Sequence, residues 1–403
     1  MNAPHPPLSI RTPARHYIGG AFRAPATGAE LPVIDPSDGK PFAAIARGDA
    51  PDVDAAVRAA RAAFDGAWGK LAPAEKGRRL MALSRAIAAH ADELAWIEAR
   101  DCGKPMKQAR ADAAACARYF EFYAGAPDKL HGDTIPYTPG YTVLTWREPL
   151  GVTGHIVPWN YPMQIFGRSV GGALAAGNAC VVKPAEDACL SLLRIAELSD
   201  EAGLPEGALN VVTGLGREAG MALATHAGID HLSFTGSPVT GALVAQEAAK
   251  RHCPVTLELG GKGPQIVFAD ADLDAAVPVI VNAIVQNAGQ TCSAGSRLLV
   301  ERSRYEELLE RLARVFSALK VGPALDDLDC GPLIRASQLD RVRGFLADAS
   351  RDKLPVAGQG SIAGTAPSSR MIFSTASAVS AFCGNAMPCA MMVDSSATTG
   401  RFS

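Results

Sequence analysis

Hydrophobic positions recur with a helical period through the first third of the chain. A first apolar face carries four positions spaced i, i+4, i+7 and i+11: Val53, Val57, Ala60 and Phe64. Five more apolar positions predict a second, longer helix: Leu80, Leu83, Ile87, Leu94 and Ile97. Both patterns are typical of amphipathic helices that pack against a core. The segment 140–151 is instead rich in Val, Thr, Tyr and Trp between Pro and Gly, so it predicts an exposed strand or hairpin arm.

Short apolar runs alternate with helical patterns from residue 152 onward. The five runs are VTGHIV, ACVVK, ALNVVTG, IDHLSFTG and PVTLELGG. Strands that alternate with helices predict a parallel sheet with helices on both faces, so the fold class is α/β. Ligands of such sheets bind beyond the carboxyl ends of the strands. Glycines and polar residues gather at those predicted ends: Asn160, Lys183, Gly214, Gly236 and Glu258.

Two further stretches complete the chain. A second α/β region is predicted from about Pro264 to Asp352, and it includes the helical run RYEELLERLARVFSALK. From about Ser368 the sequence has three charged residues in 36, no glutamate, and neither a strand nor a helix period. This composition is typical of low-complexity sequence.

Composition argues against several classes of function. The 403 residues suffice for two or three domains. Basic and acidic residues nearly balance at 39 and 41, so nothing points to nucleic acid or to a membrane surface. The N-terminus has prolines where a signal peptide would be apolar, and the longest apolar stretch, Ala275–Val285, is too short to span a bilayer. Nine cysteines without a CxxC pair favour reduced thiols in a cytoplasm, and eight histidines without an HxxxH pattern do not support a metal site.

Two glycine-containing turns are candidate cofactor contacts. The run HLSFTGSPVTG predicts a strand and then a helix whose N-cap is Ser237 and whose first residue is Pro238. Gly236 would let a ligand approach the free N–H groups of that helix, which favours a phosphate; the alternative is an ordinary strand–helix turn. The run GLGREAG, which contains Gly216, is one residue longer than the dinucleotide fingerprint and is also typical of a simple turn.

The run VVKPAED places Lys183 and Glu186 just after a predicted strand. Such a pair can hold ribose hydroxyl groups, and the carboxylate would repel a 2′-phosphate, so NAD would be favoured over NADP. The alternative is a solvated ion pair with no ligand.

Three residues are candidates for the chemistry. Glu258 stands between two leucines, where burial would strengthen it as a base; the alternative is a buried glutamate paired with a lysine. Asn160, after Trp159, could donate a hydrogen bond to an oxyanion or could simply form a turn. Cys292 lies in NAGQTCSAGSR, where small residues leave room for a reactant near the sulfur; the alternative is a buried thiol that fills the core.

In their order and spacing these motifs resemble the aldehyde dehydrogenase superfamily. The match rests on PWNYP, ALAAGNACVVKPAE, NVVTG, FTGSPVTG, VTLELGGKGPQIVFADADLD and NAGQTCSAGSR, in the order of the family. The spacing of 34 residues from Glu258 to Cys292 also matches the family. The resemblance runs from about Tyr17 to Ala349.

The resemblance implies a Rossmann-like parallel-sheet NAD-binding domain and an α/β catalytic domain with an incomplete C-terminus. We expect a first part of the NAD-binding domain, an oligomerisation-type β arm, the Rossmann-like domain, the catalytic domain and an atypical tail. Their expected bounds are 1–135, 136–151, 152–260, 261–367 and 368–403. Members of the family form homodimers or homotetramers.

The resemblance also implies roles for the candidate residues. Cys292 would be the nucleophile that forms a thiohemiacetal, and Asn160 together with the Cys292 backbone N–H would hold the oxyanion. Glu258 would activate the water that hydrolyses the thioester. The cofactor, NAD with NADP as the alternative, would contact six residues: Trp159, Lys183, Glu186, Gly216, Gly236 and Ser237.

One departure from the family pattern concerns the substrate, a small-molecule aldehyde. Arg168, followed by Ser169, resembles the semialdehyde dehydrogenases, in which an arginine meets a distal carboxylate. A carboxylate-bearing aldehyde is therefore a hypothesis, with Tyr161 as a second substrate contact. Gln286 stands where such sites carry a second arginine.

A second departure concerns the end of the chain. The EEIFGPV stretch of the family and its C-terminal strand, which joins a partner subunit, are missing. We expect a frameshift near codon 368, and one alternative to an active enzyme is a remnant that keeps the nucleotide fold without turnover. Another alternative is a CoA-acylating semialdehyde dehydrogenase. Glu258 argues against it, because a hydrolytic base would compete with the thiol acceptor.

Overall fold

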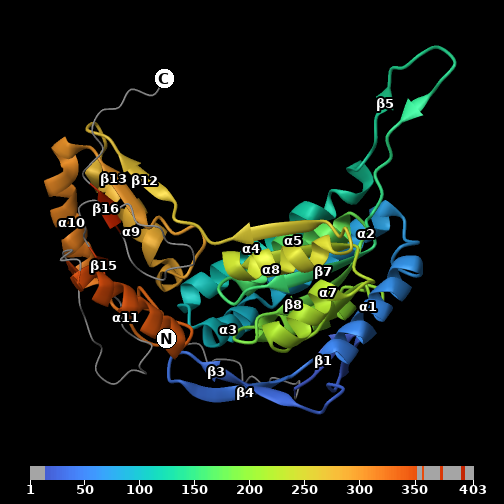
Figure 1. Cartoon of the computed structure of the whole chain (residues 1–403), viewed down its shortest axis with the longest axis horizontal. Helices are drawn as coiled ribbons and strands as arrows, with labels where there is room; N and C mark the ends of the chain where they lie inside the picture. The colour runs from blue at the N-terminus through green and yellow to red at the C-terminus, as the bar shows by residue number, and fades with distance from the viewer. Residues whose placement is uncertain (1–13, 352–355, 358–372, 375–391, 395–403) are drawn as a thin grey trace.

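A computed structural model describes residues 14–351, 356–357, 373–374 and 392–394, and Figure 1 shows their arrangement. Seven strands form the largest sheet, in the order β11-β10-β7-β8-β9-β1-β2. Five of them run parallel: β7 (Val152–Val157), β8 (Ala179–Pro184), β9 (Leu209–Val211), β10 (His231–Gly236) and β11 (Val255–Leu259). The five predicted strands and the α/β class are therefore confirmed.

The N-terminal segment extends the same sheet. β1 (His16–Ile18) pairs antiparallel with β9, and β2 (Ala21–Arg23) pairs antiparallel with β1. A separate hairpin of β3 (Glu30–Asp35) and β4 (Lys40–Ala46) follows. The large sheet thus combines strands from both sides of the predicted arm.

Helices cover this sheet from both faces. Two groups flank it: α5 (Pro162–Ala175) with α6 (Leu190–Glu201), and α1 (Ala50–Asp65) with α7 (Met221–Thr225) and α8 (Pro238–Ala249). A further helix, α4 (Met106–Ala124), packs against α5. The apolar face predicted for the first helix packs into the core, where Val53, Val57 and Ala60 are buried.

The longer helix predicted over residues 80–97 is in fact two helices. α2 (Pro73–Ala89) ends and α3 (Ala91–Cys102) begins at His90, whose φ of −106° and ψ of 19° leave the helical range. The ring nitrogen Nδ1 of His90 lies 2.9 Å from the carbonyl oxygen of Ala86, a contact that accompanies the break. The five predicted apolar positions are all buried. The apolar period continues across a break of one residue, so it could not reveal the break.

A hairpin arm projects from the body of the molecule, as Figure 1 shows. In it, β5 (Thr134–Ile135) pairs antiparallel with β6 (Val143–Leu144). The arm predicted over residues 140–151 is confirmed, although it begins earlier, with β5. It exposes large apolar and aromatic side chains, namely Tyr137, Tyr141, Leu144, Trp146 and Leu150.

A smaller sheet with its own hydrophobic core follows. β12 (Pro264–Val267) and β13 (Arg297–Val300) are parallel, and β16 (Met392–Asp394) pairs parallel with β13. The helices of this region are α9 (Leu273–Val285), α10 (Tyr305–Ala318) and α11 (Ala336–Arg351). They pack with the sheet, so the second α/β region is confirmed.

The predicted low-complexity segment lies mostly outside the described residues. Within it, β15 (Phe373–Ser374) pairs with β14 (Val356–Ala357), and β16 joins the smaller sheet. The sequence pattern did not predict β16, because three residues are too short to show a period. The predicted domain bounds stay predictions.

Short helical turns connect the larger elements. The turns are η1 (Pro127–Lys129), η2 (Gly216–Gly220), η3 (Gln286–Gly289), η4 (Arg302–Arg304) and η5 (Ala324–Asp326). Within the part of the chain that the structure describes, no helix has both the length and the apolar character needed to cross a bilayer.

Candidate functional site

The central strand β7 marks the point where the large sheet reverses direction. β8 and β9 follow on one side of β7, whereas β10 and β11 follow on the other. In open parallel sheets this switch point opens a crevice at the carboxyl ends of the strands, where ligands bind. The predicted residues lie at these ends: Trp159 and Asn160 after β7, Lys183 in β8, Gly216 after β9, Gly236 and Ser237 at β10, and Glu258 in β11.

Helix α8 begins with the predicted cap. Ser237 Oγ accepts a hydrogen bond from the backbone N–H of Thr240 at 3.2 Å, and Pro238 is the first helical residue. On the same helix Val239 and Leu243 are 58% and 47% exposed, so apolar surface lies beside the free N–H groups of the helix start. This combination suits a ligand that joins a phosphate to a flat ring.

Gly216 lies in the turn after β9, at the start of η2. It is exposed, and no heavy atom lies within 4 Å of the position that a Cβ would take. The space beside this backbone is therefore open to a ligand. Gly214 differs, because its φ is +145° and a Cβ there would lie 2.7 Å from the carbonyl oxygen of Gly48. Packing explains Gly214, whereas no packing contact explains Gly216.

Lys183 and Glu186 pair with each other. Lys183 Nζ lies 3.0 Å from Glu186 Oε2, and the Lys183 side chain is 3% exposed. Burial raises the pKa of Glu186, but the charge of Lys183, hydrogen bonds and the charge of Arg335 outweigh it, so this pKa lies below its ordinary value. The Lys183–Glu186 ion pair is thus present and ionised, but it is not the solvated pair of the alternative, because Lys183 is buried. The contact of this pair with a ribose stays a prediction.

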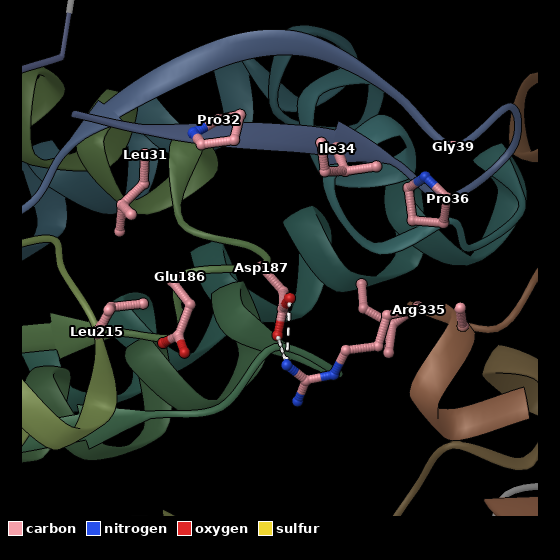
Figure 2. Close-up of a pocket in the computed structure, with 11 residues that line it drawn as sticks. Leu31, Pro32, Ile34, Pro36, Gly39, Glu186, Asp187, Leu215 and Arg335 are labelled. Atoms are coloured by element: carbon pink, nitrogen blue, oxygen red, sulfur yellow. Dashed lines mark hydrogen bonds and ion pairs between the residues drawn. The ribbon is translucent and has the colours of Figure 1, made fainter. Parts of the chain in front are cut away.

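A pocket of about 420 Å³ opens beside Glu186 (Figure 2). Residues of the β3–β4 hairpin line it together with Leu215 and Ile334, and Glu186, Asp187 and Arg335 supply its charges. Arg335 reaches Asp187, with Nη1 3.1 Å from Oδ2. The sequence patterns missed this pocket, because its walls come from segments far apart in the chain.

Asn160 connects the turn after β7 to the turn that carries the candidate nucleophile. Its Nδ2 donates to the carbonyl oxygen of Gln290 at 2.9 Å, and its Oδ1 accepts from the backbone N–H of Tyr161 at 3.1 Å. Gln290 stands two residues before Cys292, so two candidates 132 positions apart in sequence lie in contacting turns. An amide nitrogen carries two hydrogens, which leaves one for a further acceptor.

Cys292 is the exposed thiol among the seven described cysteines. Five of the others are buried, and Cys253 is partly buried. Burial raises the pKa of Cys180 and of Cys330 to about 12, so these two thiols stay protonated at neutral pH. The alternative of a core-filling Cys292 is therefore wrong, and this sulfur is open to a reactant.

The chain enters the cysteine turn through left-handed backbone. Asn287, Ala288 and Gly289 have φ of 48°, 54° and 75°. For a residue such as Ala288 this conformation costs on the order of 1–3 kcal/mol. Hydrogen bonds hold it in place: the Asn287 N–H donates to Gln108 Oε1 at 2.8 Å, and Gln290 Nε2 donates to the Asn287 carbonyl oxygen at 3.0 Å.

Glu258 is exposed, so the burial predicted for it is wrong. The reason is its place in the sheet, since β11 is the edge strand and pairs only with β10 among the described strands. Within the described part of the chain, no lysine forms an ion pair with Glu258. Three residues further on, a Cβ on Gly261 would lie 3.3 Å from the carbonyl oxygen of Cys292. The chain leaving β11 therefore passes against the cysteine turn.

The two predicted substrate contacts share one side of α5. Tyr161 precedes the helix, and Arg168 follows seven residues later, two turns along. The Tyr161 hydroxyl donates to Gln286 Oε1 at 3.4 Å. Burial raises the pKa of Tyr161 to about 12, although the charge of Lys104 opposes the rise. Arg168 is exposed.

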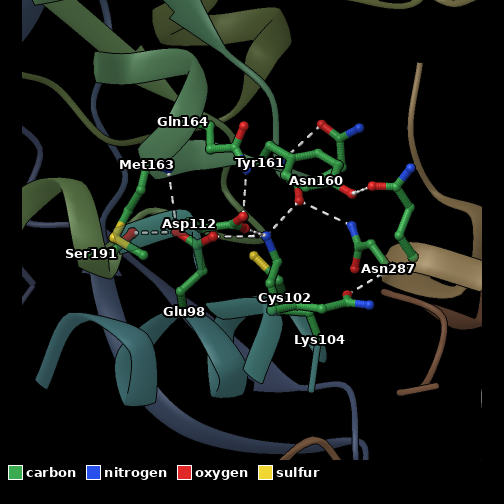
Figure 3. Close-up of polar contacts among 12 residues, drawn as sticks. Glu98, Cys102, Lys104, Asp112, Asn160, Tyr161, Met163, Gln164, Ser191 and Asn287 are labelled. Atoms are coloured by element: carbon green, nitrogen blue, oxygen red, sulfur yellow. Dashed lines mark hydrogen bonds and ion pairs between the residues drawn. The ribbon is translucent and has the colours of Figure 1, made fainter. Parts of the chain in front are cut away.

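Three buried charged residues beneath the Asn160 turn were not predicted. Glu98, Lys104 and Asp112 are at most 2% exposed. The Lys104 ammonium lies between the two carboxylates and also meets the backbone of Asn160 (Figure 3). A signal was available, because both carboxylates stand on the buried faces of helices, where a charge needs a partner. Among the described residues, no group of three or more His, Cys, Asp or Glu side chains is arranged to hold a metal ion.

Comparison with known proteins identifies relatives of the chain. The sequence pattern of the Aldehyde dehydrogenase family matches residues 22–376, beyond the end of the motif resemblance. A mitochondrial benzaldehyde dehydrogenase from Antirrhinum majus is 43% identical over 345 residues, or 85% of this chain. The chain spans 64% of the length of this curated relative and 62% of that of a second plant relative.

Solved structures share the fold. A protein from Burkholderia cenocepacia, assigned as an aldehyde dehydrogenase, is 64% identical with a TM-score of 0.92, over 94% of this chain and 81% of that chain. An aldehyde dehydrogenase from Bacillus cereus, solved in complex with NAD+, is 34% identical with a TM-score of 0.94, over 98% and 82% of the two chains. The fold expected from the motifs is therefore confirmed.

Proposed function

The chain belongs to the aldehyde dehydrogenase family, and from this premise we propose that it oxidises an aldehyde to a carboxylic acid with NAD+ as the acceptor. NADP+ is the alternative acceptor. The observation that carries the proposal is the meeting of an exposed thiol, Cys292, with the turn of Asn160 and the end of the strand that holds Glu258. These segments come from the two different sheets and from three different connections.

The first step would join the substrate to the enzyme. The Cys292 thiol is exposed and loses its proton to solvent, and the thiolate attacks the aldehyde carbon. The carbonyl π electrons move to oxygen, which becomes the oxyanion of a thiohemiacetal. The Asn160 amide hydrogen not used by Gln290 and the backbone N–H of Cys292 would donate to that oxyanion.

The residues at the carboxyl ends of the strands fit a dinucleotide. The open space at Gly216 and the capped start of α8 at Ser237 suit a pyrophosphate, and Lys183 with Glu186 would hold ribose hydroxyls. Trp159 and Gly236 lie beside the same crevice. When bound, NAD+ supplies the acceptor for the hydride that leaves the substrate carbon.

The second half of the reaction would release the carboxylic acid product. Glu258 takes a proton from water, the water oxygen attacks the thioester carbon, and the carbon–sulfur bond breaks with the thiolate as leaving group. The exposed position of Glu258 supports this role, because water reaches it and its proton can return to solvent. A CoA-acylating enzyme would instead require a thiol acceptor.

The deciding experiment measures NADH formation over a panel of aldehydes. We expect activity in the wild type and its loss in Cys292→Ala, because no described thiol of comparable exposure replaces Cys292. Cys253→Ala is the matched control and should keep its activity, since Cys253 precedes β11, at the end of that strand away from the catalytic turns. Cofactor binding without NADH from any aldehyde would instead favour the non-catalytic remnant.

Glu258→Gln separates the two halves of the reaction. We expect one rapid equivalent of NADH per site and then arrest, because acylation does not need the base whereas hydrolysis does. Steady turnover restored by CoA in place of water would support the CoA-acylating alternative. Steady turnover in water at the wild-type rate would remove Glu258 from the mechanism.

A carboxylate-bearing aldehyde is the second candidate substrate. The observation that favours it is the shared side of α5, where exposed Arg168 follows Tyr161 by two turns. Succinic semialdehyde should then be used more efficiently than a neutral aldehyde of similar size, and Arg168→Ala should remove that preference. Equal efficiency in both proteins would end this proposal.

We also propose an assembly and a location, from the exposed apolar side chains of the arm and from the cysteines. A homo-oligomer is supported by the exposed apolar side chains of the β5–β6 arm, which burial against another copy would stabilise. A cytoplasmic location is supported by the described cysteines, which are all free. Sedimentation of the wild type, with Trp146→Ser and Leu144→Ser as arm variants, tests the assembly.

A further inference from the structure

The backbone carbonyl of Asn160 is held from two directions. Lys104 Nζ donates to this oxygen at 2.9 Å, and Asn287 Nδ2 donates to it at 3.0 Å. Figure 3 shows both contacts converging on the oxygen. A carbonyl oxygen has two lone pairs, so both are used. We call Lys104 and Asn287, with these two hydrogen bonds, the carbonyl clamp.

The position of Lys104 is set by how α3 ends. Gly103 has φ of +80°, and a Cβ there would lie 2.9 Å from side-chain carbons of Pro36 and of Pro332. Glycine is therefore needed both for the left-handed turn and for the close packing. The turn sends Lys104 inward, and its side chain is 0% exposed.

The Lys104 ammonium has no spare donor. Its three hydrogens match three acceptors: Glu98 Oε1 at 2.7 Å, a carboxylate oxygen of Asp112, and the Asn160 carbonyl oxygen. The two carboxylates are themselves anchored, because Glu98 Oε2 accepts from the Met163 N–H at 3.3 Å and Asp112 Oδ1 accepts from Gln164 Nε2. The ammonium therefore has one fixed place.

The turn above the ammonium is fixed at further points. The Tyr161 ring lies over Lys104 Nζ at 4.4 Å from its centroid, and Cys102 Sγ donates to the Trp159 carbonyl oxygen at 3.0 Å. The residues before and after Asn160 are thus held by the same segment of the chain that supplies Lys104. The Asn160 side chain has little freedom left, with both its amide atoms bonded.

Stability alone does not explain this arrangement. A buried ion cluster gains little over apolar side chains of the same volume, because desolvation offsets the attraction between the charges. A cluster that ends on the backbone of one particular residue instead fixes that residue in space. An oxyanion donor is the kind of group that needs such fixing, since its effect falls steeply with distance from the developing charge.

We propose that the carbonyl clamp positions the Asn160 amide for the oxyanion, with Lys104 and Asn287 as positioning residues for aldehyde oxidation. This inference rests on the proposed function. Neither residue touches the reacting atoms. Lys104 holds the turn from beneath, and Asn287 ties it to the cysteine turn, so the clamp sets the distance between the oxyanion donor and the nucleophile.

The test compares Lys104→Met with Lys76→Met. Lys76 is a matched control, since it is 8% exposed, donates to the carbonyl oxygens of Gly69 and Leu71, and lies over the Trp68 ring at 5.7 Å. Both variants should lower the melting temperature. Lys104→Met should lower kcat by about 10- to 100-fold with KM and NAD+ affinity little changed, because the oxyanion forms only during reaction. Lys76→Met should keep kcat within about threefold.

A double variant shows whether Lys104 acts through Asn160. In an Asn160→Ala background the further loss caused by Lys104→Met should fall below about threefold, because two residues that serve one hydrogen bond are not additive. Asn287→Ala should lower kcat in the same way and should lose its effect in the same background. If Lys104→Met does not fold, Asn287→Ala alone tests the carbonyl clamp.

The outcomes separate the clamp from the reaction. An active wild type with kcat unchanged in both Lys104→Met and Asn287→Ala overturns the clamp and leaves the proposed function standing. Full additivity with Asn160→Ala also overturns it, because the lysine would then act elsewhere. A wild type that forms no NADH from any aldehyde overturns the proposed function and, with it, the role of the clamp.

Discussion

Hydrogen bonds of very different range hold the candidate residues at the two ends of the crevice. At the cofactor end, Ser237 and Thr240 bond across three residues, as do Lys183 and Glu186. At the catalytic end, Asn160 bonds Gln290 across 130 residues and Asn287 across 127. Local bonds form wherever their turn forms, whereas the long-range bonds exist only when both sheets are in place. The cofactor end is therefore expected to survive changes that disable the catalytic end.

The largest effect should come from removing the oxyanion donor. Asn160→Ala should lower kcat by about 10²- to 10³-fold, because one preorganised donor to a developing oxyanion contributes on that order. NAD+ affinity should stay within about twofold, since the hydrogen bonds of Asn160 to described residues go to Gln290, Tyr161, Lys104 and Asn287 and not to the start of α8 or to the Lys183–Glu186 pair. Steady-state kinetics measure the expected loss of kcat, and a fluorescence titration with NAD+ measures the expected unchanged affinity.

An exposed asparagine provides the control for that change. Asn282 lies on α9 and is exposed, so Asn282→Ala should leave kcat near the wild-type value. If Asn160→Ala weakened NAD+ binding as much as it slowed turnover, the two ends would not be separable and the comparison would fail.

The same difference in range explains which features the sequence could predict. The Ser237 cap and the Lys183–Glu186 pair each lie within a single strand–helix segment, β10–α8 and β8–α6, so the local pattern contains every group involved. The exposure of Glu258 depends on β11 being an edge strand, which follows from the order of strands and not from the residues beside it. The small residues around Cys292 made it a candidate, and the resemblance to a family assigned it as the nucleophile.

The carbonyl clamp lies beyond local pattern altogether. Lys104 is 56 residues from Asn160 in sequence, and Asn287 is 127 residues away. The residues next to Lys104 and next to Asn287 in the sequence do not indicate that the Asn160 carbonyl oxygen accepts their hydrogen bonds. A charged residue on a buried helix face, such as Glu98 or Asp112, predicts that some partner exists, and three-dimensional packing decides which one.

A fall in pH should have opposite effects on two contributions to the stability of the fold. It should weaken the contribution of His155 in the sheet and strengthen that of Glu98 in the charged cluster. Burial lowers the pKa of His155, in β7, to about 3, so its neutral form is favoured on folding and its contribution to stability, complete above pH 6.5, is lost as the pH falls. Burial raises the pKa of Glu98 to about 8; the charge of Lys104 opposes this rise, and Asp112 adds to it. Its contribution is complete below about pH 4.5 and is lost as the pH rises through 8.

Urea unfolding at several pH values measures both effects. Relative to the wild type, His155→Gln should gain about 2 kcal/mol between pH 7 and pH 5, because a group that shifts from 6.5 to about 3 loses that amount. Glu98→Gln should instead gain relative stability as the pH rises from 5 to 8. Parallel pH profiles in the wild type and either variant would refute the assignment for that residue.

A smaller effect is expected on the choice of cofactor. Glu186→Gln removes the charge that would repel a 2′-phosphate and keeps a hydrogen-bonding group for the ribose. The ratio of kcat/KM with NAD+ to kcat/KM with NADP+ should therefore fall about tenfold. Asp187→Asn is the matched control in the same pocket, because Asp187 pairs with Arg335 at 3.1 Å and not with Lys183. Equal narrowing in both variants would mean that the pocket's total charge, and not Glu186, sets the preference.

The smallest effect tests how local the cofactor end is. Ser237→Ala removes the side chain that accepts from the Thr240 N–H, which should cost about 1 kcal/mol of stability. Ser237→Asp keeps an accepting oxygen at the cap, so stability should return to near the wild-type value. It also places a negative charge where a pyrophosphate would lie, so NAD+ affinity should fall although the helix is intact.

The two Ser237 variants therefore separate the cap from the ligand site. If the start of α8 holds the pyrophosphate, Ser237→Asp is the more stable protein and the weaker binder, and Ser237→Ala is the reverse. Chemical unfolding and an NAD+ titration at low and high salt show this, because the repulsion weakens with ionic strength and the cap does not. Equal NAD+ affinity in both variants at low salt would place the pyrophosphate elsewhere and leave Ser237 as a cap alone.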